Sequence, residues 1–189
     1  MSNFKLIDNL PILDLKTELF SMLKNHEIRW GENTDQICLN SIYEDDMDIH
    51  LGCGSLYIDW DKKVVKNNAI NVPKKETVLK ESQFKYLCPQ FKDTIFEELY
   101  NILSKHYEFG RVRFMRLIPH KCMSWHLDDT MRLHYPIKTQ DGCFMIIGNE
   151  MLHLKQDTWY MTDTKIKHTA LNASKEERIH LVVSIIGEK

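Results

Sequence analysis

Two stretches of the chain place apolar residues three and four positions apart, which is the spacing of one face of an α-helix. The first runs from about Asp14 to Asn25, and Asp14 is of a type that caps helix N-termini. The second runs from about Phe91 to His106, with Pro89 just before it and Gly110 just after it. Each stretch has a single apolar stripe, so we expect each helix to pack on one side against a larger body.

From residue 111 onward the pattern changes to a period of two, and short apolar runs alternate with turn residues. The predicted turns are Asp141-Gly142, Gly148-Asn149 and residues 172–177. The predicted strands are Arg111–Pro119, Arg132–Lys138, Cys143–Ile147, Met151–Leu154, Thr158–Thr162, His168–Leu171 and Arg178–Ile186. Many short strands at this spacing favour a mainly β fold with flanking helices and a double-sheet jelly roll, or double-stranded β-helix, as its core.

The region between the two predicted helices is harder to interpret. Ser55–Trp60 has the pattern of a strand, and Lys62–Lys85 is a polar stretch that holds Pro73 and seven lysines. We expect that stretch to be a long surface excursion, either a lid or binding loop or a solvated connection without a role. The length of 189 residues predicts one domain. Within it, residues 1–110 are expected to supply helical and substrate-side elements, and residues 111–187 the jelly-roll metal-binding core.

Composition narrows the function by exclusion. The chain has 25 Lys and Arg against 27 Asp and Glu, a net charge of −2, so we expect neither a nucleic acid nor a membrane as partner. The five cysteines are scattered and form no CxxC pair, which argues against a disulfide framework or a zinc knuckle and fits a reducing compartment. The N-terminus lacks the pattern of a signal peptide, and no apolar run approaches the length of about 20 residues that spans a bilayer. These features together favour a cytoplasmic protein.

The informative chemistry begins at His126-Leu127-Asp128. On an extended backbone, side chains two positions apart lie on the same side, so this imidazole and this carboxylate can reach one metal ion. Asp129 then points to the opposite side. His168, which begins a later predicted strand, would complete a set of two histidines and one carboxylate. That set leaves coordination positions open and is diagnostic of non-heme Fe(II) oxygenases.

Two strands add cations next to these ligands. Arg178, His180 and Ser184 share one face of the last predicted strand, opposite its apolar residues. Arg132 and His134 likewise share one face of theirs. An oxygenase that uses 2-oxoglutarate must hold a dicarboxylate beside the metal, and Arg supplies a charge-assisted, bidentate partner for a carboxylate. The pattern therefore predicts a pocket for an anionic ligand.

In its second half, from residue 111 to 186, the chain resembles a known family. The stretches that carry the likeness are Arg113-Phe-Met-Arg-Leu-Ile-Pro, His126-Leu-Asp128, Arg132-Leu-His134-Tyr-Pro-Ile, Trp159 before Asp163, His168 with Asn172, and Arg178-Ile-His-Leu. In this order they are similar to the aspartyl/asparaginyl β-hydroxylases, Fe(II)/2-oxoglutarate-dependent dioxygenases that include bacterial proline hydroxylases. Because the animal members lack the carboxylate ligand, Asp128 favours the bacterial, cytosolic branch.

The resemblance implies a site and a reaction. His126, Asp128 and His168 would be the catalytic metal ligands for Fe(II). Arg178 would hold the distal carboxylate of 2-oxoglutarate, with Arg132 and His134 near its chelating end. With O2, such an enzyme hydroxylates an unactivated C–H bond and releases succinate and CO2. A free amino acid is the first expected substrate, and an amino-acid side chain on a peptide or protein is the second.

The sequence also leaves one alternative function open. A non-oxygenase, cupin-like metal-binding protein, either an isomerase or a small-ligand binding module, is the alternative. Such proteins usually carry His-x-His followed by Glu, whereas this chain has Asp128 at the second position. GxSxG and HExxH motifs are missing, which argues against serine hydrolases and zinc proteases. We expect surface or packing roles for the histidines at 26, 50, 106, 120 and 153. We expect core positions for Trp125 and Trp159, although Trp125, beside a candidate ligand, could instead form a wall of the pocket.

Overall fold

The computed structural model describes residues 2–54, 56, 60–65, 68–73 and 79–189. Within these ranges, one antiparallel sheet is built from β1 (Phe4–Ile7), β2 (Gln36–Cys38), β7 (Tyr107–Leu117), β9 (Met131–Lys138), β12 (Trp159–Thr162) and β14 (Arg178–Glu188). A second is built from β8 (Lys121–Cys122), β10 (Cys143–Ile147), β11 (Glu150–Leu152) and β13 (His168–Asn172). The helical elements are α1 (Leu15–Lys24), α2 (Ile95–His106) and the 3-10 turns η2 (Glu81–Gln83) and η3 (Pro89–Phe91). Two short pairs complete the description, β3 (Asn40–Ser41) with β6 (Tyr86–Leu87) and β4 (Trp60–Val65) with β5 (Asn68–Pro73).

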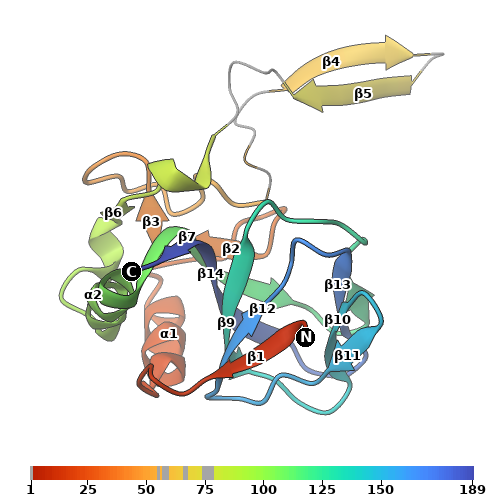
Figure 1. Cartoon of the computed structure of the whole chain (residues 1–189). Coiled ribbons are helices and arrows are strands. Elements are labelled where there is room, and N and C mark those ends of the chain that lie inside the picture. Colours follow the sequence, from red (N-terminus) through yellow and green to blue (C-terminus); the bar gives the residue numbers. More distant parts are fainter. Residues whose placement is uncertain (1, 55, 57–59, 66–67, 74–78) are drawn as a thin grey trace.

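The two main sheets form a double-stranded β-helix. The larger has the strand order β1-β12-β9-β14-β7-β2 and the smaller the order β11-β10-β13-β8, and neighbours pair antiparallel throughout. The chain passes from one sheet to the other between β9 and β10 and again between β12, β13 and β14 (Figure 1). Such crossing connections characterise a jelly roll. The fold predicted from the period-two pattern is confirmed, and the N-terminal half contributes the two edge strands β1 and β2.

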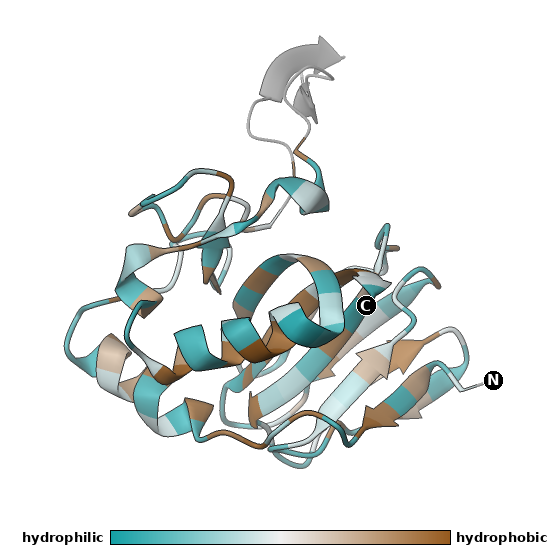
Figure 2. Cartoon of the chain, turned by 60° about the vertical axis from the view of Figure 1, so that its left-hand side comes forward, coloured by the Kyte–Doolittle hydropathy of each residue, from teal (hydrophilic) through white to brown (hydrophobic). Residues whose placement is uncertain are grey.

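Alternation along the strands sends each face of the larger sheet to a different neighbour. In β14, Ile179, Leu181 and Val183 belong to the main apolar core, together with residues of both helices. Arg178 and Val182 line a cavity on the other face. The helices α1 and α2 lie beside the larger sheet, away from the smaller one (Figure 1), and Figure 2 shows each with a hydrophobic and a hydrophilic side. The helices therefore bury one face of the sheet, and the opposite face is left for the site.

The first predicted helix is confirmed almost to the residue. α1 begins after Asp14, whose side chain accepts a hydrogen bond from the Thr17 backbone N–H. This bond satisfies one of the amide groups that have no partner within the first helical turn. Leu15, Leu19 and Met22 are buried on one side, as their spacing predicts.

The predicted start of the second helix and of the strand after it were wrong. α2 begins at Ile95, because the Thr94 hydroxyl accepts from the Phe96 N–H, and Phe91 instead ends the 3-10 turn η3. β7 follows α2 without a turn. Gly110 lies inside β7, where a Cβ atom would come within 2.6 Å of the Glu81 side chain. This glycine marks a close approach of two segments and not the end of a helix.

The region between the helices is described only in part. Most of the predicted strand 55–60 lies outside the described residues. The stretch 62–85 includes most of the β4–β5 hairpin and η2, and ends just before β6, so it contains regular elements, and a role as a lid stays a prediction. No helix in the described part of the chain is long and apolar enough to cross a membrane.

Candidate metal centre and anion-binding cavity

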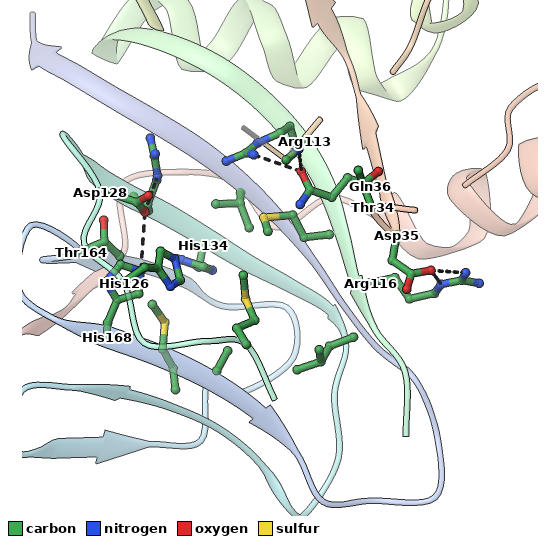
Figure 3. A pocket seen from close by; sticks show the side chains of 18 of the residues that line it. Thr34, Asp35, Gln36, Arg113, Arg116, His126, Asp128, His134, Thr164 and His168 are labelled. Atoms are coloured by element: carbon green, nitrogen blue, oxygen red, sulfur yellow. Dashed lines mark hydrogen bonds and ion pairs between the residues drawn. The ribbon is translucent and has the colours of Figure 1, made fainter. Parts of the chain in front are cut away.

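A cavity of about 390 Å³ lies between the two sheets. Its walls come from β7, β9 and β14 of the larger sheet, β10 and β13 of the smaller one, and the segment that joins β8 to β9. All six residues predicted for the site line it: His126, Asp128, Arg132, His134, His168 and Arg178. Figure 3 shows His126, His168 and Asp128 gathered at one end, with Arg113 and Gln36 at the other.

Within the described ranges, His126, Asp128 and His168 form the only cluster suited to hold a metal ion, with their ligand atoms within 4.8 Å of one another. Two backbone hydrogen bonds join the histidines, from His126 N to His168 O at 3.1 Å and from His168 N to His126 O at 2.9 Å. Leu127 and Asp129 are exposed, so side chains do alternate along this extended segment.

The hydrogen bonds of both histidines leave the same ring nitrogen for a metal. His126 Nδ1 donates to the Ser124 carbonyl at 2.7 Å, and His168 Nδ1 donates to the Ile166 carbonyl at 2.9 Å. Since a carbonyl can only accept, each neutral ring presents its Nε2 lone pair. His168 Nε2 lies 3.6 Å from Asp128 Oδ2. Burial is the main cause that lowers the pKa of His168, which favours the neutral, metal-binding form. Two imidazoles and one carboxylate fit Fe(II).

Asp128 is held by Arg132. Burial alone raises the pKa of Asp128, but the charge and hydrogen bond of Arg132 outweigh it and lower the pKa overall. Arg132 Nε donates to Asp128 Oδ2 at 3.0 Å, and its Nη1 donates to Glu81 Oε1 at 3.1 Å and to Thr130 Oγ1 at 2.7 Å. Asp128 is thereby kept ionised and oriented, as a metal ligand requires.

Glu81 was not found by sequence reasoning. It lies in η2, is 7% exposed, and accepts from Arg111 Nη2 at 2.8 Å as well as from Arg132. Burial raises the pKa of Glu81, but the two arginines outweigh this effect and lower the pKa to about 2. A lone Glu within a polar stretch carries no signal of its partners in the sequence.

Arg178 is a buried cation without an anionic partner in the part of the chain that the structure describes. It is 5% exposed, and within the described ranges no carboxylate lies within 4 Å of it. Its Nη2 donates to His180 Nδ1 at 2.9 Å. Burial lowers the pKa of Arg178 to about 10. Burial also lowers the pKa values of His134 and His180, and the charge of Arg178 lowers them further, so both imidazoles are neutral. Among the described residues, the beginning of β14 therefore offers one uncompensated positive charge, that of Arg178.

Arg113 is a second such cation and was also missed as a site residue. It is 5% exposed, and its Nη1 donates to Gln36 Oε1 at 3.0 Å while its Nε has no partner among the described residues. Burial, with the neighbouring arginines 111 and 132, lowers its pKa to about 9. One signal could have found it: Arg111 and Arg113 alternate with the apolar Val112 and Phe114, the pattern of a charged inner face on a strand.

The two tryptophans predicted to lie in the core differ in their exposure. Trp159 is in the core at 2% exposed, as predicted. The prediction of a core position for Trp125 was wrong, because it is 49% exposed and the Lys167 ammonium lies 5.8 Å from its ring centroid. The extended segment that points His126 inward turns this neighbouring side chain outward. None of the five histidines predicted to have surface or packing roles, at 26, 50, 106, 120 and 153, joins the metal cluster in the described part of the chain.

A jelly roll that brings two histidines and one carboxylate to the mouth of a cationic cavity defines a class of metal-binding β-helix proteins. The model of the aspartyl/asparaginyl β-hydroxylase family matches residues 48–187, and the chain belongs to this family. The family expected from the motifs is therefore confirmed. A curated relative, the L-proline cis-4-hydroxylase of Rhizobium meliloti strain 1021, is 23% identical in an alignment that covers 89% of this chain. The chain spans about 60% of that relative's length.

The chain is also similar to solved structures at low sequence identity. The 2-oxoglutarate complex of a viral collagen prolyl hydroxylase from Paramecium Bursaria Chlorella virus-1 is 14% identical and covers 97% of this chain and 96% of its own, with a TM-score of 0.47. A cupin domain from Bordetella pertussis is 20% identical and covers 41% of this chain and 82% of its own, with a TM-score of 0.37.

Proposed function

We propose that the protein is an Fe(II)/2-oxoglutarate-dependent dioxygenase that hydroxylates an unactivated C–H bond of a free amino acid and releases succinate and CO2. One observation carries this proposal: the cluster of His126, Asp128 and His168 opens onto the same cavity as Arg178, a buried cation without a carboxylate partner among the described residues. Membership of a hydroxylase family supports it. Iron held by the three ligands would supply the activation of O2.

The residues around the ligands divide the binding of 2-oxoglutarate between them. Arg178 pairs with the distal carboxylate, because a buried guanidinium is strongly favoured when an anion compensates its charge. His134 is neutral, lines the same cavity, and lies near enough to Arg178, Asp128 and His168 to respond to their charges, so it can hydrogen-bond the chelating end without adding charge. Arg132 is already bound to Asp128 and Glu81, so its part is to fix Asp128 and to add positive potential there.

Arg113 supports a substrate that carries its own carboxylate. It lies on β7 and lines the same cavity as Arg178, so the cavity holds two buried cations without carboxylate partners in the described ranges. If Arg178 takes the cosubstrate, Arg113 is left for the substrate. A free amino acid brings that carboxylate, whereas a side chain within a protein lacks it. The proline hydroxylase relative makes proline the first amino acid to test.

The first test is spectroscopic. Fe(II) protein is mixed with 2-oxoglutarate without oxygen, and a visible charge-transfer band is expected because the cosubstrate binds the metal directly. The free amino acids, proline first, are then screened by the succinate that each releases in air. Folded, iron-loaded protein that shows no band would refute the oxygenase proposal and favour the cupin-like alternative.

Variants assign the roles. His168→Ala should abolish both the band and substrate-dependent succinate formation, because two ligands remain. Arg178→Ala should chiefly raise the concentration of 2-oxoglutarate required. Arg113→Ala should keep the band, since it does not serve the cosubstrate, but raise the KM for the amino acid. If Arg113→Ala weakens 2-oxoglutarate binding as much as Arg178→Ala does, the division between the two cations is wrong.

A further inference from the structure

Two cysteines lie directly behind the end of the cavity formed by Arg113 and Gln36. The Sγ atoms of Cys38 and Cys53 are 3.6 Å apart. Cys38 ends β2 and is fully buried, whereas Cys53 is half-buried in the loop that leads to Gly54. Both are free thiols. Since an S–S bond is about 2.05 Å long, the two sulfur atoms need to approach by only about 1.5 Å to form one.

The surroundings of the pair differ from those of a metal site. His50 lies close by, but these three residues do not form a metal cluster, and within the described ranges the one such cluster is at His126. The pKa of Cys53 is lowered to about 6, first by the hydrogen bond with Cys38 and further by His50 and the charge of Arg113. The pKa of Cys38 is raised instead. One sulfur therefore serves as the nucleophile and the other as the resolving thiol.

The pair is joined to the cavity by hydrogen bonds. Gln36, two residues before Cys38, accepts at Oε1 from both Arg113 Nη1 and the Gly54 backbone N–H, each at 3.0 Å. On the other side of the loop, Arg111 Nη1 donates to the carbonyls of Gly52 at 2.7 Å and Gly54 at 3.1 Å. A movement of Cys53 toward β2 also moves the neighbouring Gly54 N–H. It therefore changes the position of the Gln36 side-chain amide, which holds Arg113.

We propose that Cys38 and Cys53 are a redox modification site that hydrogen peroxide converts into a disulfide, and that the disulfide alters the hold on Arg113. The Cys53 thiolate attacks one peroxide oxygen, the O–O bond breaks, and a sulfenic acid forms as hydroxide leaves and takes up a proton. The Cys38 sulfur then attacks the Cys53 sulfur, the S–O bond breaks, and a second water leaves with the thiol proton. Two thiols lose two electrons, and the peroxide is reduced to two waters.

The proposed oxidant is hydrogen peroxide from the surroundings, and the site needs no other reactant. The disulfide itself does not depend on the proposed oxygenase function. Only its expected consequence, weaker binding of the amino-acid carboxylate through Arg113, rests on the proposed function.

The test follows the chemistry in the full-length, metal-free protein. The reduced chain is treated with one equivalent of hydrogen peroxide, remaining thiols are blocked, and the intact mass and peptide map are measured. We expect a loss of two hydrogen masses, a linkage between the peptides that hold Cys38 and Cys53, and full reversal by dithiothreitol. In a ¹H–¹⁵N spectrum, oxidation should shift the side-chain resonances of Arg113 and Gln36 and leave the amides of α1 unchanged.

Three variants make the result specific. Cys53→Ser should form no disulfide, and Cys38→Ala should stop at a Cys53 sulfenic acid that dimedone traps. Cys122→Ser, which removes an exposed thiol on β8 of the smaller sheet, should behave as the wild type. A linkage that involves another cysteine, or peroxide consumption without a linkage, overturns the proposal. An unchanged Arg113 resonance in the disulfide form overturns its coupling to the cavity. Either result leaves the test of the oxygenase function untouched.

Discussion

Glu81 controls the charge balance of the cavity wall, because a single carboxylate contacts both Arg111 and Arg132. Glu81→Gln would leave these two buried guanidinium groups without their shared anion. Breaking a buried ion pair on one side costs roughly 3 kcal/mol or more. We therefore expect the free energy of unfolding in urea to fall by about that amount at pH 7, and metal affinity to fall as Arg132 loosens its hold on Asp128.

A surface ion pair provides the matched control. Asp45 accepts from Lys92 at 2.6 Å, and both side chains are exposed. Asp45→Asn makes the same chemical change as Glu81→Gln but in solvent, where such pairs contribute little. Its urea midpoint should equal that of the wild type. Equal losses in the two variants would show that the burial of Glu81 does not determine its contribution.

The same residue predicts how stability changes with acid. The pKa of Glu81 falls from its usual 4.5 to about 2 on folding, so the unfolded chain binds the proton more tightly. The stabilisation is then complete above about pH 4.5 and is lost as the pH falls toward 2. The stability difference between the wild type and Glu81→Gln should therefore shrink steadily over this range in urea titrations. A difference that stays constant down to pH 2.5 would contradict the assignment.

At the scale of elements, Thr94 decides where α2 begins. Its hydroxyl donates to the Phe91 carbonyl at 2.7 Å and accepts from the Phe96 N–H at 3.1 Å, so it joins η3 to the helix. Thr94→Ala should lower the free energy of unfolding by about 1 kcal/mol, the usual cost of a lost N-cap. Thr94→Ser keeps the hydroxyl and should restore most of it. Because the helix lies on the far face of the sheet, metal affinity should stay unchanged in both variants.

The same elements show what the sequence could and could not predict. Periodicity located β10 and α1 well, and the motif spacing predicted that His126, Asp128 and His168 come together, as they do; their role as metal ligands stays a prediction. The beginning of α2 was missed because a 3-10 turn continues the apolar spacing into Phe91. The roles of Glu81 and Gln36 could not be predicted, since each depends on an arginine 30 or more residues away in the sequence. Glu81 accepts from the Arg111 backbone N–H, and Gln36 accepts from the Arg113 guanidinium, each at 3.0 Å.

At the scale of the whole molecule, the net charge of −2 conceals a strongly cationic interior. Arg111, Arg113, Arg132 and Arg178 are each 5% exposed or less. In the described ranges, Glu81 and Asp128 are the carboxylates that compensate them. A bound metal would also draw on the negative charge of Asp128, which already pairs with Arg132. The excess of positive charge therefore favours anionic ligands, in a buried site where salt screens charges only weakly. The acidic groups that set the overall charge lie mostly on the surface, where they do not compete.

The three candidate metal ligands also come from two parts of the molecule. His168 belongs to the smaller sheet, whereas His126 and Asp128 lie on the segment that runs from that sheet to β9 of the larger one. Four backbone hydrogen bonds hold the segment in place: the two between His126 and His168, one from Met123 N to Ala170 O at 2.9 Å, and one from Asp128 N to Thr164 O at 2.9 Å. A metal that binds only the folded arrangement suppresses local opening of these bonds. Saturating Zn²⁺, a redox-inert probe, should therefore slow amide hydrogen exchange at His126, Asp128 and His168 by tenfold or more, which corresponds to about 1.4 kcal/mol.

The helices supply the internal reference for this measurement. α1 and α2 contact the opposite face of the larger sheet, so their amides should exchange at the same rate with and without Zn²⁺ if the metal acts locally. In His168→Ala the slowing should vanish at all three positions, because the remaining ligands no longer bridge the segment and the smaller sheet. Uniform slowing across sheets and helices would mean instead that exchange proceeds through global unfolding. In that case the metal would stabilise the molecule as one cooperative unit, and the protection of every amide would rise by the same factor.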